Sequence, residues 1–169
     1  MKLEPLLQMP NVMMGVWRRF GVHAFEGRVT AADMDRMASA GEGWMRKNPG
    51  TFVEMVIIFP SDARMSGDER AKLAGIIKKG EARRSASATV VLSSGLTGAM
   101  HRSVLTGLQM LAPPPHPAKV FGAVDEAVFW LSPHVRAVCG PEATTQAIQD
   151  AVDRMCAVFR PRTLQAGTA

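Results

Sequence analysis

Hydrophobic and polar positions along the chain change their period several times, and each change predicts a new element. The segments 11–19 and 21–27 are short apolar runs, which predict two strands that pair antiparallel through a turn near Phe20. From Thr30 onward apolar residues return every three or four positions, as on one face of a helix. Asn48, which is followed by Pro and Gly, predicts the end of that helix.

The middle of the chain alternates between two patterns. Strongly apolar runs at 51–59, 87–94 and 118–124 predict three buried strands. Amphipathic patterns at 66–84 and 97–112 predict the two helices that connect them. The core-facing positions are predicted to be Leu73, Ile76 and Ile77 in the first helix and Met100, Val104, Leu108 and Leu111 in the second.

The C-terminal third predicts two more helices. Asp125 is a suitable cap for a short helix over 125–134, and Pro133 is expected to help close it. A final helix, 141–160, is expected to start at Pro141, because proline favours the first turn. Its predicted apolar stripe consists of Ile148, Ala151, Val152, Met155 and Phe159.

Buried strands that alternate with amphipathic helices are typical of an α/β fold with a mostly parallel sheet. We therefore predict a sheet of about five strands, flanked by helices, with an antiparallel edge formed by the first pair. The 169 residues, of which 47% are hydrophobic, suit one domain over 1–160 with a flexible tail at 161–169.

Composition narrows the chemistry. The formal charge of +5 permits an anionic partner, but no nucleic-acid recognition motif accompanies the basic residues, so no nucleic acid is expected. Cys139 and Cys156 lack the spacing of a metal-binding pair, and the four histidines lie on four separate elements. We therefore expect free thiols, no metal and no cofactor. No apolar run reaches the roughly 18 residues of a transmembrane span, and the first residues do not resemble a secretory signal; both observations favour a cytoplasmic protein.

Ser66 opens the helix predicted at 66–84 and has two interpretations. Ser-x-x-Glu, with Glu69 in the fourth position, is the capping-box pattern, in which each side chain accepts a bond from the other residue's backbone amide. A phosphate on Ser66 would also favour the positive end of the helix dipole, although Asp62, Asp68 and Glu69 would oppose its charge. Ser66 is therefore a predicted helix cap and a candidate phosphorylation site.

A second polar turn, LSSGLTGAMHRS at 92–103, follows the next buried strand. Because ligands bind beyond the carboxyl ends of parallel strands, this turn and the loop before Ser66 are expected to lie side by side. Backbone amides and hydroxyls at a helix start favour an anion or a partner contact, whereas the simpler interpretation is a turn capped by Thr97. No nucleophile with a base and an orienting acid can be assigned here, so we expect no catalytic residue and no enzyme. The candidate ligand- or partner-binding residues are Ser61, Ser66, Gly67, Ser94, Gly95, Thr97, Gly98 and His101.

Three stretches, in this order, resemble the STAS superfamily, and within it the SpoIIAA-like branch of bacterial anti-sigma-factor antagonists, which is related to the lipid-binding Sec14 fold. They are FEGRVTAADMDRM, MVIIFPSDARMSGDERAKL and AKVFGAVDEAVFWL, and the likeness covers residues 12–135. The second stretch corresponds to the family's strand, loop and helix that hold a regulatory serine. Phosphorylated antagonists typically have Asp-Ser-Ser-Gly or Asp-Ser-x-Gly there, whereas this chain has Arg64-Met65-Ser66-Gly67.

The resemblance implies a non-enzymatic regulatory domain that binds a protein partner through the loops at 60–67 and 93–101, switched by phosphorylation of Ser66 or by a small ligand. The relationship to Sec14 implies an alternative, a carrier or sensor of a small apolar, lipid-like ligand. A carrier or sensor requires a cavity, and the expected lining of that cavity is Met34, Met37, Met100, Phe121 and Trp130.

The last helix lies outside the resemblance and is expected either to pack across the sheet or to mediate self-association as a homodimer.

Overall fold

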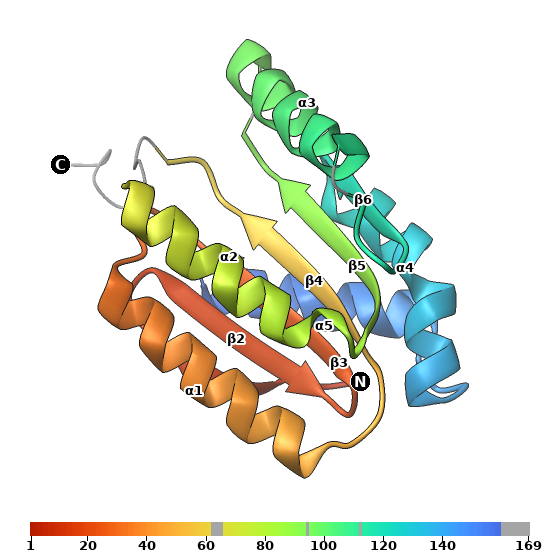
Figure 1. Cartoon of the computed structure of the whole chain (residues 1–169). Helices are drawn as coiled ribbons and strands as arrows, with labels where there is room; N and C mark the ends of the chain where they lie inside the picture. The colour runs from red at the N-terminus through yellow and green to blue at the C-terminus, as the bar shows by residue number, and fades with distance from the viewer. Residues whose placement is uncertain (62–65, 94, 112, 160–169) are drawn as a thin grey trace, which may run out of the picture.

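The structure of the protein, a computed structural model, describes residues 1–61, 66–93, 95–111 and 113–159, without the side chains at 97, 108, 109 and 111 (Figure 1). The predicted tail at 161–169 lies outside this description. In chain order the elements are β1 (Glu4–Gln8), β2 (Val12–Trp17), β3 (Phe20–Phe25), α1 (Ala31–Lys47), β4 (Phe52–Ile58), α2 (Gly67–Glu81), β5 (Arg84–Val91), α3 (Gly95–Leu111), β6 (Ala118–Phe121), α4 (Val124–Cys139) and α5 (Thr145–Val158).

Within the described ranges, six strands form one mixed sheet in the order β1-β2-β3-β4-β5-β6. The first three strands pair antiparallel, and β3 to β6 pair parallel. This arrangement confirms the predicted α/β fold with an antiparallel N-terminal edge. The turn between β2 and β3 falls at Arg18 and Arg19, just before its predicted position, and Arg18 has a φ of 53°.

The sequence pattern missed β1, so the sheet has six strands rather than about five. Pro5 lies in this strand and lacks an N–H, which is tolerated where one side of a strand has no neighbour. β1 pairs with β2 alone and forms that edge of the sheet. Its register is irregular between Pro5 and Leu7, so no regular alternation marks it in the sequence.

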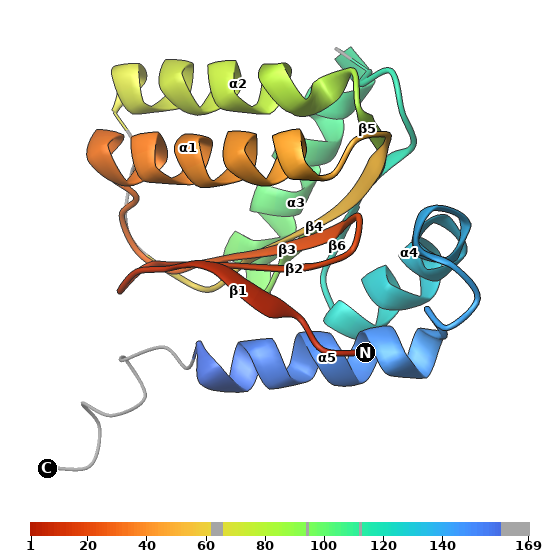
Figure 2. The same cartoon turned by 90° about the horizontal axis from the view of Figure 1, so that it is seen from below.

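Helices cover both faces of the sheet (Figure 2). α1 and α2 lie side by side on one face, and α4 and α5 lie on the other. α3 packs against β5 and β6, at the edge farthest from β1. The arrangement is a sheet between two helical layers, as expected when strands and helices alternate along the chain.

The face covered by α4 and α5 carries the main hydrophobic core. Alternate residues of β4, namely Val53, Met55 and Ile57, are fully buried on it. Leu131 of α4 and Ile148 of α5 join the same core and are equally buried. Burial of side chains of this size stabilises a fold by about 1.5–3 kcal/mol each, so this face holds the molecule together.

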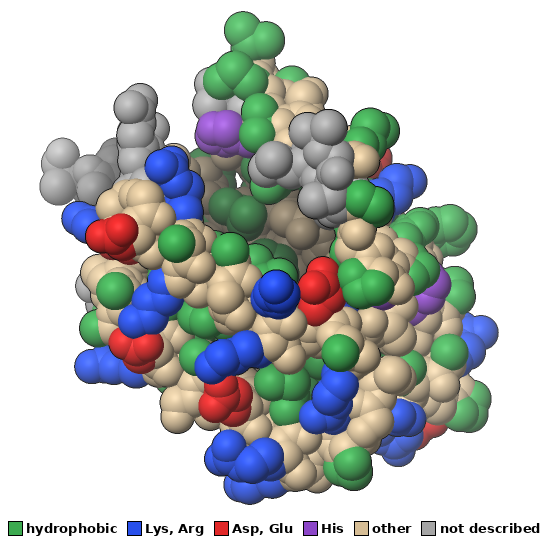
Figure 3. Space-filling view, viewed as in Figure 1, with side chains coloured by type: hydrophobic (Ala, Val, Ile, Leu, Met, Phe, Trp, Pro, Cys, Tyr) green, Lys and Arg blue, Asp and Glu red, His purple; other side chains and the backbone are tan. Residues whose placement is uncertain are grey.

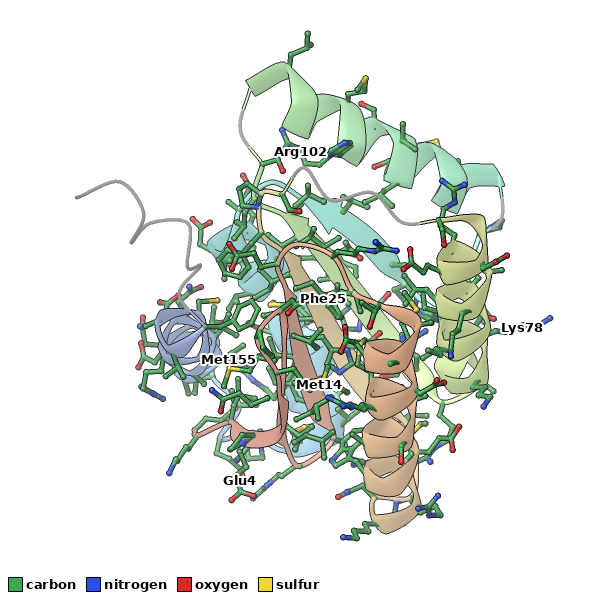
Figure 4. All side chains as sticks on the ribbon, turned by 90° about the vertical axis from the view of Figure 1, so that its left-hand side faces the viewer. Glu4, Met14, Phe25, Lys78, Arg102 and Met155 are labelled. Carbon is green, nitrogen blue, oxygen red and sulfur yellow. The ribbon has the colours of Figure 1, made fainter. Side chains whose placement is uncertain are left out.

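α5 contributes its whole predicted stripe to this core. Figure 4 shows Met155 directed from α5 toward the sheet, where its sulfur lies close to Gly15 of β2. The last helix therefore packs against the sheet of its own chain, the first of its two predicted roles. It starts later than predicted, because the Thr144 Oγ1 accepts from the amide of Ala147 at 3.2 Å and Pro141 lies in the preceding turn. The buried residues of the stripe are Ile148, Ala151, Val152, Met155 and Phe159.

Both predicted ends of α4 are wrong. The helix runs from Val124 to Cys139 rather than over 125–134, and its N-cap is Ala123, while Asp125 lies in the first turn. Arginines of the β2–β3 turn cap the other end: Arg19 donates to the carbonyl of Val138, and Arg18 donates to that of Cys139. Basic groups at a helix C-terminus satisfy the last carbonyls, which explains why α4 extends to this point.

Pro133 lies inside α4 and does not close it. A proline in a helix interior removes one hydrogen bond and costs about 3 kcal/mol. Leu131 and Val135, on either side of it, are fully buried in the main core. Two such side chains contribute about 1.5–3 kcal/mol each, which is enough to offset the proline.

The helices on the other face are less buried than predicted. Ile77 of α2 is 49% exposed, and Met100 and Val104 of α3 are 57% and 56% exposed. Leu108 and Leu111 lie among the side chains outside the description. The helical period was predicted correctly. The apolar face of a helix is buried, however, only where side chains of the sheet or of another helix pack against it.

Candidate functional site

The face of the sheet covered by α1 and α2 encloses a cavity of about 490 Å³, which is bounded by β2 to β5 and by α1, α2 and α3. Figure 3 shows the surface hollowed between α2 and α3. Cavities of about 300–1,000 Å³ with mostly apolar walls are typical sites for small molecules. The apolar wall includes Met14, Phe25, Met37, Trp44, Val56, Ile58, Leu73, Ile76 and Leu105.

Small residues keep this space open. Gly21 of β3 and both Ala38 and Gly41 of α1 line the cavity, and a Cβ built on Gly41 would meet no atom within 4 Å. α2 packs against α1, and its Leu73 and Ile76 are only partly buried. The two helices thus roof the cavity without filling it.

The size of the cavity matters for stability. The cavity opens to the surface between α2 and α3, so water contacts its apolar wall when no other molecule occupies it. Covering apolar surface contributes about 25 cal/mol for each Å² removed from water. A molecule that fills the space would therefore stabilise the fold.

Three ionisable side chains from neighbouring strands form a polar cluster in the cavity wall: His23 of β3, Glu54 of β4 and Arg84 of β5. His23 Nδ1 lies 3.4 Å from Glu54 Oε1, and Arg84 Nε lies 2.8 Å from Glu54 Oε2. The side chains of Glu54 and Arg84 are 14% and 7% exposed. Burial of charged groups is costly unless they are paired, and here the two charges face each other.

Arg84 contacts several neighbouring residues, but its guanidinium N–H groups form no hydrogen bond to a described residue. Its guanidinium lies over the ring of Phe52 at 5.6 Å. Gly80 of α2 leaves room beside it, since a Cβ there would approach Nη2 to 3.4 Å. Nε forms an ion pair with Glu54 without the geometry of a hydrogen bond, and the structure shows no hydrogen bond from Arg84 to any residue that it describes.

Burial lowers the pKa of His23 below its usual 6.5; the Glu54 carboxylate offsets part of this effect, and the positive charge of Arg84 adds to it. His23 is therefore neutral at pH 7. The cluster then carries one positive charge on Arg84 and one negative charge on Glu54, so its net charge is zero.

Two of the predicted binding residues, Ser61 and His101, line this cavity. Ser61 follows β4, and His101 belongs to α3, which follows β5. The segments after these adjacent parallel strands therefore meet, as the strand order predicted. Ser66 and Gly67 instead lie at the start of α2, away from the cavity wall.

Gly95 and Gly98 begin α3 for reasons of backbone geometry. Gly95 has a φ of 65°, and a Cβ on Gly98 would lie only 1.8 Å from the carbonyl oxygen of Ser93. Both positions therefore favour glycine whether or not a ligand binds. Ser94 and the side chain of Thr97 lie outside the description, so their role stays a prediction.

Ser66 caps α2 as predicted. Its Oγ accepts a hydrogen bond from the amide of Glu69 at 3.2 Å, and its own amide donates to Glu69 Oε2 at 2.7 Å. Arg28 binds the same carboxylate at 3.0 Å. The bond from the Ser66 amide, followed by that from Arg28, lowers the pKa of Glu69. This confirms the capping box, while phosphorylation of Ser66 stays a prediction.

The expected cavity lining was wrong in all but one position. Met37 lines the cavity, but Met34 is part of the packed core under α1, and Met100 is exposed. Phe121 and Trp130 line a separate open groove between α3, β6 and α4. The helical period identified the apolar residues correctly, but it could not show which of them pack against other side chains and which line the cavity.

The three polar residues of the cluster were also not predicted from the sequence. Glu54 interrupts the otherwise apolar run 51–59, and that single charge was the available signal. Arg84 was assigned to the end of a helix, but α2 ends at Glu81 and Arg84 begins β5. His23 gave no signal, because its partners come from strands far along the chain.

Within the described ranges, no group of three or more His, Cys, Asp or Glu side chains could hold a metal ion. Nor is any helix in that part of the chain long and apolar enough to span a bilayer.

The fold and the cavity together define an α/β domain of SpoIIAA-like topology with an internal space of ligand size. Among solved structures, the chain is similar to an uncharacterised protein of the DUF3478 family with a SpoIIAA-like fold from Shewanella loihica PV-4. The TM-score is 0.58 and the identity 15%, over 72% of this chain and 94% of that chain. This likeness confirms the predicted fold. No protein-family model matches the chain, and comparison with curated proteins finds no relative.

Proposed function

We propose that this protein is a non-enzymatic carrier or sensor of a small, largely apolar ligand, which binds in the cavity between the sheet and α1, α2 and α3. The observation that supports this proposal is the cavity itself, with its volume of about 490 Å³ and its largely apolar wall. A filled interior would have excluded such a function. At the roughly 30 Å³ that one water molecule occupies in the liquid, the cavity has the volume of about 16 water molecules.

The arrangement of α3 suggests how a bound ligand would be sensed. His101 and Leu105 of α3 line the cavity, while Leu96, Met100 and Val104 of the same helix are exposed. A ligand would therefore contact one side of a helix whose other side presents apolar residues to the surroundings. Occupancy of the cavity would then change the position of α3, and with it the exposed apolar surface that a partner could contact.

A fluorescence titration with 1-aminoanthracene tests the cavity directly, because this probe is uncharged, apolar and of suitable size. We expect saturable binding with one site per chain. Gly41→Leu should weaken binding at least 10-fold, since its side chain would extend into the cavity. Gly75→Leu is the matched control, because Gly75 is an exposed glycine of α2 that does not line the cavity. No saturable binding, or equal binding by both variants, would contradict the proposal.

A second candidate function is that of a regulatory, partner-binding domain in the cytoplasm, which the SpoIIAA-like fold suggests. The observation that favours it is the exposed apolar surface beside the groove between α3, β6 and α4. Met110 of α3 and Phe129 of α4, which both line this groove, are 79% and 77% exposed. Apolar side chains grouped in this way are common at sites of protein contact.

Ser66→Asp tests whether such a partner is controlled by phosphorylation. If Ser66 is the switch, the variant should no longer capture a partner protein that the wild type captures from lysate of its own cells. Met100→Ser combined with Val104→Ser, on the exposed side of α3, should lose the same partner. Unchanged capture by Ser66→Asp would leave that residue as a helix cap alone.

A further inference from the structure

We propose that Arg84, Glu54 and His23 form the head-group site of the cavity, and that they select an uncharged amphipathic ligand whose polar end is a hydroxyl group. This inference rests on the proposed function, since it names the class of ligand that the cavity would take. The remaining wall is largely apolar and would hold the tail of that ligand.

The cluster provides both partners that a hydroxyl group needs. The side chain of Arg84 is 7% exposed and lines the cavity, and the structure shows no hydrogen bond from its guanidinium to any described residue. Its free N–H groups can therefore donate to the hydroxyl oxygen. Glu54 is a carboxylate, which accepts only, and the hydroxyl hydrogen can be donated to it. A hydroxyl group donates and accepts at once, so it suits this pair.

Net charge decides between head groups. Arg84 and Glu54 face each other at 2.8 Å, and their opposite charges cancel. An added carboxylate or phosphate would leave an unpaired negative charge in an apolar wall, and an ammonium group would leave a positive one. Either is costly in a site of low dielectric, whereas an uncharged hydroxyl adds no charge.

A purely structural role for the cluster explains less. A buried ion pair is weak evidence for stability, because well-packed apolar residues of similar volume are often as stable or more so. The pair also faces the cavity rather than the filled core on the other side of the sheet. The ring of Phe52 covers one face of the guanidinium, whereas Gly80 has no side chain beside it, and Arg84 is part of the cavity wall.

The test compares 1-decanol and decanoate as competitors that displace 1-aminoanthracene at pH 8. Both probes are unbranched and have ten carbon atoms, and they differ in the head group, an uncharged hydroxyl in one and a carboxylate in the other. We expect the wild type to bind 1-decanol at least 10-fold more tightly than decanoate. Equal affinities, or tighter binding of decanoate, would overturn the head-group proposal even if the cavity binds apolar molecules.

Glu54→Gln should reverse the preference, because it leaves the positive charge of Arg84 without its partner. Decanoate should then bind at least 10-fold more tightly than it does to the wild type. An unchanged preference would overturn the proposal. Since this variant leaves a buried charge unpaired and is at risk of unfolding, a second variant, Glu54→Gln with Arg84→Met, removes both charges.

The double variant should retain binding of 1-aminoanthracene and bind 1-decanol about 10-fold more weakly than the wild type. Its matched control is Glu42→Gln with Lys79→Met, which removes an exposed ion pair of 3.0 Å at the cavity rim and should leave both affinities unchanged. Wild-type affinity for 1-decanol in the double variant would overturn the head-group site. Absence of 1-aminoanthracene binding to the wild type would instead overturn the cavity proposal, and this inference with it.

Discussion

At the scale of single residues, Glu54 carries the most information about this molecule. It is one charged residue within an apolar strand, and it joins His23 and Arg84 from the strands on either side. The sequence alone predicted a buried strand here, because the residues around Glu54 in the run 51–59 are nearly all apolar, but it did not show which side chains Glu54 would contact. Contacts between strands are set by the sheet order, which local pattern does not contain.

His23 predicts a pH dependence of stability. Because burial lowers its pKa, the unfolded chain binds more protons than the folded chain at pH values between that lowered pKa and 6.5. The free energy of unfolding should therefore fall as the pH is lowered through 6.5. Urea unfolding at pH 7.5 and 5.5 should show this decrease in the wild type and a smaller one in His23→Gln. His116, whose pKa burial also lowers, accounts for a remaining part. An equal decrease in both proteins would refute the assignment to His23.

At the scale of elements, helix starts and buried stripes were predictable because their signals are local. The capping box of Ser66 and Glu69 and the apolar stripe of α5 are both present. β1 and the length of α4 were not predictable, because they depend on distant contacts. β1 forms because it pairs with the free edge of β2. α4 continues beyond Pro133 because residues before and after that proline are buried in the main core.

The cap of α2 makes a testable prediction of its own. Ser66→Ala removes the oxygen that accepts from the Glu69 amide and should lower the free energy of unfolding by about 1 kcal/mol. Ser66→Asp serves as the control for stability, since aspartate is an equally good N-cap, and it should cost less than the alanine variant. Chemical denaturation of the three proteins measures both differences. If alanine were tolerated without loss, the cap would contribute nothing.

At the scale of the whole molecule, the two faces of the sheet differ. One face is packed by α4 and α5, and the other encloses the cavity under α1, α2 and α3. Both faces consist of apolar residues in strands of the same period, so the sequence predicted a sheet covered on both sides without this difference. Which side is filled depends on how closely the helices approach, and that is a property of the assembled fold.

Two neighbouring residues of β4 measure the difference between the faces. Ile57 is fully buried on the packed face, whereas Ile58 faces the cavity. Ile57→Ala should destabilise the fold by about 2–5 kcal/mol, the usual range for such a core truncation. Ile58→Ala should cost clearly less, because its side chain already borders open space. Comparable losses in denaturant unfolding would mean that the cavity face is as well packed as the other.

Native mass spectrometry of the chain purified from its own cells, beside a denatured control and the Gly41→Leu variant, tests the central claim most directly. We expect extra mass on the wild type that disappears on denaturation and is absent from Gly41→Leu. A bare wild-type chain in both spectra would contradict it. So would extra mass that survives denaturation and maps to Ser66, which would indicate a phosphorylated regulator instead.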